Sequence, residues 1–288
     1  MTAPLALIDT HQHLILRGAL GYGWTAGLPA LATASFTPAD YARLTAGRGV
    51  VGSLFMETGV DDGDYQTEAR LIAGLVGRDG MLGQIASCRP EQDAGFDAWL
   101  DECGGLGVHG FRRILHVVDD GLSQATTFRA NLRKIGRRGM PFDLCVLARQ
   151  HGLAEDLVRT LDDQIFVLDH CGNPDIAGGQ FTPWAEGVRR LAQYPNVVAK
   201  LSGITVNCAP GTVSAALLRP YVAHLVDCFG ADRVLWGSDW PVVEVNAALP
   251  EWIDLTQELL SGASDAERHA IGLGTARRIY NLSQGTVE

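Results

Sequence analysis

The chain has 288 residues, of which 47% are hydrophobic and 19% are charged, and its formal net charge is −10. This composition is typical of a globular protein with a substantial core. The acidic balance, without any block of Lys and Arg, argues against a nucleic acid or an anionic membrane as partner. No basic leader or membrane-length apolar run is present, and the six cysteines show no CxxC spacing. We therefore expect a cytoplasmic protein with free thiols and a small-molecule partner. A homo-oligomer is compatible with the sequence, which leaves the number of subunits open.

The first predicted strand begins in the apolar run Leu5-Ala6-Leu7-Ile8 and continues into Asp9-Thr10-His11-Gln12-His13. Because side chains two apart in a strand project from the same face, we expect Asp9, His11 and His13 to point the same way. Two imidazoles on one face can share a metal ion or converge on one polarised oxygen.

Seven further apolar segments alternate with segments of helical length. A Gly-rich loop, Arg17 to Ala34, separates the first strand from a helix with Thr37 as N-cap and Pro38 at its first position. The predicted strands are Val50–Met56, Met81–Cys88, Val108–Leu115, Pro141–Val146, Gln164–Leu168, Val197–Leu201 and Arg233–Trp236. The predicted helices between and after them include Asp64–Val76, Phe96–Glu102, Thr127–Arg137, Leu153–Leu161, Pro183–Ala192, Leu217–Phe229, Trp252–Leu260 and Asp265–Tyr280.

Eight such repeats predict the α/β class and a (β/α)8 TIM barrel, built as a single domain over residues 1–288. An open doubly wound sheet is the alternative, but no Gly-x-Gly-x-x-Gly turn follows the first strand.

Polar residues stand at the carboxyl ends of the predicted strands, where barrels of this class place their active sites. The candidates are His11 and His13, Glu57, Arg112 and His116, His170, Lys200 or Ser202, and Asp239. Strands one and eight become neighbours when the barrel closes, so Asp239 should face the histidine pair. Only one of Arg112 and Arg113 should point inward, and counting back from the strand end favours Arg112.

Four motifs resemble the amidohydrolase superfamily, in its amidohydrolase-related branch. They are Asp9-Thr10-His11-Gln12-His13, Leu168-Asp169-His170-Cys171-Gly172-Asn173-Pro174, Lys200-Leu201-Ser202-Gly203 and Gly237-Ser238-Asp239-Trp240-Pro241. That branch includes sugar-lactone hydrolases and 2-pyrone-4,6-dicarboxylate lactonases. The resemblance implies a distorted barrel in which Asp239 activates the hydrolytic water and His11, His13 and His170 surround the scissile carbonyl.

The resemblance also implies limits on the metal content. The fourth strand offers Arg112 and Arg113 instead of a Lys that could be carboxylated to bridge two ions, so a binuclear centre is not expected. Members of the branch carry one divalent ion or none. Three imidazoles and one carboxylate, from His11, His13, His170 and Asp239, can hold one zinc or similar ion, and that ion can be dispensable.

The resemblance therefore implies a hydrolase that opens a lactone ring, with a sugar-acid lactone as the expected substrate and carbohydrate catabolism as the setting. Asp239 is the expected general base, and a protonated His170 or the arginines can polarise the carbonyl. Arg112, His116, Glu57, Trp24 and Asn173 are the expected substrate contacts. The alternatives are a metal-dependent non-oxidative decarboxylase, a pyrone or muconolactone hydrolase, and a binding protein without catalysis.

Overall fold

The computed structural model describes residues 5–283. Eight parallel strands form one sheet in the order of the chain, from β1 to β8. Their bounds are β1 Leu7–Gln12, β2 Val50–Met56, β3 Met81–Ser87, β4 Val108–Ile114, β5 Phe142–Cys145, β6 Phe166–Leu168, β7 Val197–Leu201 and β8 Val234–Trp236. The predicted α/β barrel in a single domain is confirmed.

The sheet closes at the carboxyl ends of β1 and β8. Gln12 and Trp240 form an isolated parallel bridge, and the His13 N–H donates to the Trp240 carbonyl at 2.7 Å. The Asp239 N–H donates to the His11 carbonyl at 2.8 Å. These backbone bonds bring the chain around His11 and His13 against the chain around Asp239, although the two segments are more than 220 residues apart.

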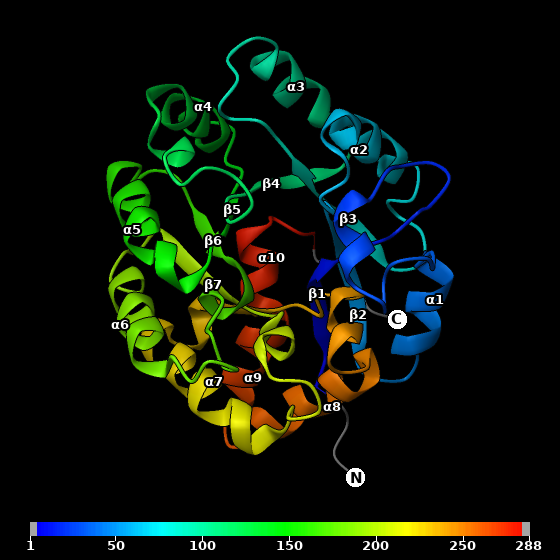
Figure 1. Cartoon of the computed structure of the whole chain (residues 1–288), viewed down its shortest axis with the longest axis vertical. Helices are drawn as coiled ribbons and strands as arrows, with labels where there is room; N and C mark the ends of the chain where they lie inside the picture. The colour runs from blue at the N-terminus through cyan, green and yellow to red at the C-terminus, as the bar shows by residue number, and fades with distance from the viewer. Residues whose placement is uncertain (1–4, 284–288) are drawn as a thin grey trace.

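Helices surround the strands in chain order, as Figure 1 shows from α1 to α8. Their bounds are α1 Pro38–Thr45, α2 Tyr65–Ala73, α3 Phe96–Cys103, α4 Thr126–Gly136, α5 His151–Thr160, α6 Phe181–Leu191, α7 Ala215–Phe229 and α8 Leu249–Leu259. Thr37 and Asp40 form a reciprocal capping box at the start of α1, as the Thr37-Pro38 signal predicts. Within the described residues, no helix has the length and apolar character needed to cross a membrane.

The predicted helix Asp265–Tyr280 is not continuous. It consists of α9 (Asp265–His269), a π-helical turn over Ala270–Gly274, and α10 (Thr275–Ile279). A Cβ placed on Gly272 would lie 2.3 Å from the carbonyl oxygen of Ala6, so the turn packs against β1 at a distance that only glycine permits. Leu273 of this turn and Tyr280 after α10 pack against strand residues such as Ile8 inside the barrel, so the C-terminal segment fills one mouth (Figure 1).

Candidate active site

A bulge in β1 decides where its polar side chains point. Asp9 pairs with Ser53 and Gln12 with Phe55, so β1 uses three residues where β2 uses two. The expectation that Asp9 shares a face with the histidines is therefore wrong. Its carboxylate accepts hydrogen bonds from the Tyr41 hydroxyl of α1 at 2.6 Å and from the Ser238 N–H at 2.8 Å. Asp9 thus links β1 to α1 and to the chain after β8.

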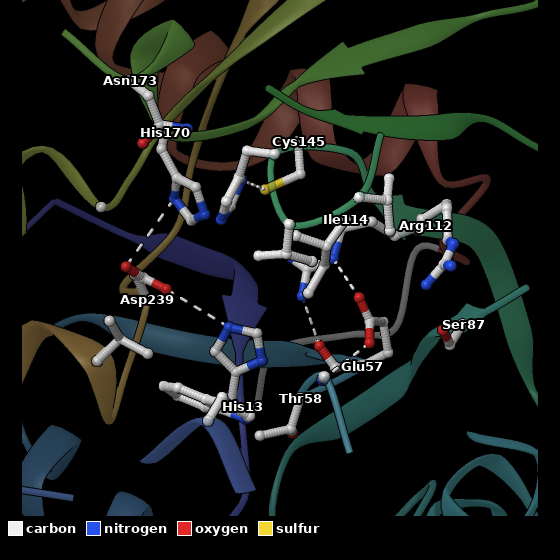
Figure 2. A pocket seen from close by; sticks show the side chains of 18 of the residues that line it. His13, Glu57, Thr58, Ser87, Arg112, Ile114, Cys145, His170, Asn173 and Asp239 are labelled. Carbon is white, nitrogen blue, oxygen red and sulfur yellow. Dashed lines mark hydrogen bonds and ion pairs between the residues drawn. The ribbon is translucent and has the colours of Figure 1, made fainter. Parts of the chain in front are cut away.

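The rings of His11 and His13 remain together, with centroids 4.9 Å apart, and both approach Asp239. The Asp239 Oδ1 lies 3.4 Å from His13 Nε2 and 3.8 Å from His11 Nε2. Its Oδ2 lies 3.9 Å from His170 Nδ1. Figure 2 shows Asp239 facing both His13 and His170. The structure thus brings together the three imidazoles and the carboxylate.

The backbone at two of these residues has an uncommon conformation. His170 and Asp239 have φ values of 55° and 59°, in the left-handed region that non-glycine residues rarely occupy. Such strain is typical of functional sites, where the surrounding structure holds it in place. His170 lies two residues after the end of β6 and Asp239 three residues after the end of β8, and the sharp change of direction there lets their side chains approach each other.

Burial keeps two of the imidazoles neutral. Desolvation lowers the pKa of His11 well below its usual value, and desolvation also lowers the pKa of His170. A protonated His170 is therefore not the ground state near neutral pH. His13 places Nδ1 at 2.9 Å from the Met56 carbonyl, which can only accept, so Nδ1 carries a proton and Nε2 faces Asp239.

Arg112 is buried on the floor of the site and is paired with Glu57. Its Nε donates to Glu57 Oε1 at 2.6 Å, and its Nη1 lies 3.1 Å from His11 Nε2 and 3.4 Å from Asp169 Oδ2. Burial opposes the charge, but the Glu57 carboxylate holds the pKa of Arg112 above its usual range. Arg113 forms an ion pair with Glu91 at 2.8 Å. Both arginines contribute to the wall of the cavity, although Arg112 alone contacts the histidines among the described residues.

A cavity of about 600 Å³ opens above Asp239, a size common for small-molecule sites. Its lining includes the remaining candidates His116, Trp24 and Asn173. Desolvation lowers the pKa of His116 to about 4, and its Nδ1 lies 3.5 Å from the Cys145 thiol. The Asn173 side-chain amide donates to the Val146 carbonyl at 2.9 Å, which leaves less of it free for a ligand.

Beneath the histidines lies a buried ionic network. A buried ion pair is one of the two roles that the sequence leaves open for Lys200, the other being substrate binding, but its partners were not predicted. Lys200 is fully buried and pairs with Asp143 and with Asp169, whose Oδ1 is 3.1 Å from Nζ. The Lys200 ammonium holds the pKa of Asp169 well below its usual range, although burial opposes this. Asp169 in turn lies 3.3 Å from His11 Nδ1. The sequence contains one signal of this network: the acidic residues Asp143 and Asp169 lie within or directly after otherwise apolar strands.

The donor set partly fits a divalent cation. His11, His170 and Asp239 offer ligand atoms within 4.8 Å of one another, and His13 Nε2 lies 3.4 Å from the same carboxylate. The His13 contact with the Met56 carbonyl is the kind of outer hydrogen bond that orients metal-binding imidazoles. The guanidinium of Arg112 competes for His11 Nε2, so full use of this ring as a ligand requires Arg112 to withdraw.

Known proteins resemble this chain over almost its whole length. An L-fucono-1,5-lactonase of Burkholderia multivorans is 28% identical over 96% of both chains. A crystal structure of an amidohydrolase from the same species with bound zinc superposes with a TM-score of 0.88, at 26% identity, over 96% of this chain and 100% of that one. A proposed 2-pyrone-4,6-dicarboxylic acid hydrolase from Pseudomonas putida has a TM-score of 0.74 at 24% identity, over 98% and 99% of the chains, and shows the fold alone.

A family model described as Amidohydrolase matches residues 8–282, which include every strand except the first residue of β1 and every residue of the site above. The match extends from the first strand, which carries His11 and His13, to the C-terminal segment that fills the barrel mouth. The chain therefore belongs to the amidohydrolase family and is a hydrolase of this family.

Proposed function

We propose that this protein hydrolyses a lactone, a cyclic carboxylic ester, by attack of a water molecule that Asp239 deprotonates. The position of the Asp239 carboxylate carries the proposal, because it faces three imidazoles at the floor of an open cavity. The full-length similarity to an L-fucono-1,5-lactonase supports an ester as the bond that is cleaved.

Asp239 suits the role of general base because, among residues 5–283, its ion-pair partners are histidines and not arginine or lysine. The neighbouring rings of His11 and His170 are neutral, so the carboxylate can accept a proton from water. His13 Nε2 lies 3.4 Å away, and the two atoms together can hold and orient the attacking water. A divalent ion, when bound by the same residues, would acidify this water and polarise the carbonyl.

Negative charge develops on the carbonyl oxygen during the attack, and Arg112 is the cation placed to stabilise it. Its guanidinium lines the cavity and is held by Glu57, so we propose that Glu57 acts by positioning Arg112. His116, Trp24 and Asn173 line the same cavity and are proposed to contact the substrate away from the reacting carbonyl.

A pH-indicator assay of proton release tests this function. We expect hydrolysis of at least one lactone among L-fucono-1,5-lactone and simple δ-lactones, with and without chelator. Asp239→Asn should lower kcat about 10²–10⁴-fold, the usual contribution of a general base. Asp62→Asn is the matched control, because this carboxylate lines the same cavity but pairs with Arg89. A wild-type rate in Asp239→Asn, or CO2 release from aromatic acids without any lactone hydrolysis, would contradict the proposal.

A further inference from the structure

The loops above Asp239 surround the cavity with apolar side chains. Six of the eight loops that follow strands contribute to this apolar wall, which consists of Trp24, Val60, Val117, Leu147, Val206 and Val242. The ionisable groups of the reaction lie deeper, at the strand ends, where Figure 2 shows His13, Glu57, His170 and Asp239. A ligand whose reacting carbonyl reaches Asp239 must therefore place its other end against the apolar wall.

Part of this wall is exposed to solvent. Val117 is 67% exposed and Trp24 is 39% exposed. Among the described residues, the other large hydrophobic side chains with such exposure are Leu82 and Ile165, which lie at the start of β3 and just before β6, toward the opposite mouth. Exposed apolar groups that border a reactive cavity are typical of a ligand-binding surface.

Most polar side chains in the lining already have protein partners. Arg89 bonds to Asp62 and to Ser87, both at 2.8 Å. The Thr58 hydroxyl donates to the Leu14 carbonyl at 3.1 Å, and Asn173 donates to Val146.

Arg113, which also lines the cavity, has one donor without a partner among the described residues. Its Nε is a buried donor for which the described residues offer no acceptor. A sugar-acid lactone presents several hydroxyl groups that each need a partner, and this wall offers few.

We propose that the natural substrate is a lactone whose ring carries an apolar alkyl or aryl substituent, and that the apolar wall binds this substituent. The inference rests on the proposed lactone hydrolysis. It specifies lactones with an apolar substituent as substrates instead of the polyhydroxylated sugar-acid lactones. The carbonyl lies at Asp239 and Arg112, the ring lies between them and Ile114, and the substituent extends past Val117 toward solvent.

A series of δ-lactones tests this substrate class: δ-valerolactone, then the same ring with methyl, propyl and pentyl groups, compared with L-fucono-1,5-lactone. Each buried methylene should raise kcat/KM about three- to fourfold until the wall is covered. A flat or falling series, or a preference of tenfold or more for the sugar lactone, would overturn the proposal. If none of these lactones is hydrolysed, the proposed function is wrong. The affinity of the protein for non-hydrolysable analogues then tests whether the apolar wall binds an apolar substituent.

Binding is measured by calorimetry with δ-lactams, which keep the ring and carbonyl but resist hydrolysis. The pentyl-substituted lactam should bind at least tenfold more tightly than the unsubstituted one. The double variant Trp24→Ser/Val117→Ser replaces two exposed side chains, so its fold should persist, and it should lose most of this ratio. Leu82→Ser removes an exposed apolar side chain outside the cavity and should keep the ratio. Equal lactam affinities in the wild type, or an equal loss in Leu82→Ser, would refute the apolar wall as a binding site.

Discussion

Gly203 lies directly against His170. A Cβ placed on Gly203 would come within 2.2 Å of His170 Nδ1 and 3.0 Å of Asp239 Oδ2, and the backbone there has a φ of +59°. The glycine follows β7, between the strand ends that carry the two functional side chains. Its missing side chain therefore determines how closely the His170 imidazole can approach Asp239.

Replacing this glycine should displace the site. Gly203→Ala should lower kcat/KM for the lactone substrate about 100-fold, because a shift of about 1 Å at the reacting groups costs this much. Gly211→Ala is the matched control, since Gly211 also has a positive φ (+73°) but its Cβ would meet nothing within 4 Å. Both variants should lose similar stability from backbone strain. Equal activities in the two variants would show that Gly203 does not position His170.

Removing one partner of the buried ion pair between Arg112 and Glu57 should lower the stability of the protein. In Arg112→Met the carboxylates of Glu57 and Asp169 lose a cation inside the barrel, and the free energy of unfolding should fall by about 3–5 kcal/mol. Urea denaturation measures the change. Arg113→Met, whose ion pair with Glu91 is partly exposed at the cavity wall, should cost less than Arg112→Met. The double variant Glu57→Gln/Arg112→Met should recover part of the loss, and an additive result would contradict charge pairing as the cause.

Arg112 should also weaken metal binding. It occupies a position 3.1 Å from His11 Nε2 and repels a dication at the same imidazole. We expect the double variant Glu57→Gln/Arg112→Met to bind Zn2+ about tenfold or more tightly than the wild type in calorimetric titration. Arg113→Met, which keeps Arg112 at His11, should bind Zn2+ like the wild type. An unchanged affinity in the double variant would mean that zinc does not use His11.

The strands and their order were predictable because parallel strands buried on both faces appear as continuous apolar runs. The prediction for β2, Val50–Met56, agrees with the structure at both ends. The closeness of Asp239 to His13 also follows from topology, since β1 and β8 are neighbours in a closed barrel. These inferences need only the sequence pattern and the direction of each strand.

Other features depend on contacts that the sequence pattern does not contain. The bulge that turns Asp9 away from His11 arises from the register of β1 against β2. The ionic network joins Lys200 of β7 to Asp143 of β5 and to Asp169 just after β6, so no local spacing in the sequence reveals it. Likewise, His11 and Arg112 were each predicted as site residues, but the contact between them became visible only in the structure.

Glu68, in α2, should make stability fall with rising pH. Burial, followed by the charge of Glu57, raises the pKa of Glu68 to about 8, against an ordinary value of 4.5. The folded protein thus retains a proton that the unfolded chain releases in this range, so the contribution to stability is full below about pH 4.5 and is lost as the pH approaches 8.

Glu68→Gln tests this, because a glutamine oxygen can still accept from the Thr58 N–H, as Glu68 Oε1 does at 3.0 Å, but binds no proton. We therefore expect the free energy of unfolding of the wild type, relative to Glu68→Gln, to fall by about 1.4 kcal/mol per pH unit across this range. Urea denaturation of both proteins at several pH values measures the difference. Parallel pH profiles would mean that Glu68 is ionised in the folded protein, and that the Glu57 charge is balanced by Arg112 without a protonated neighbour.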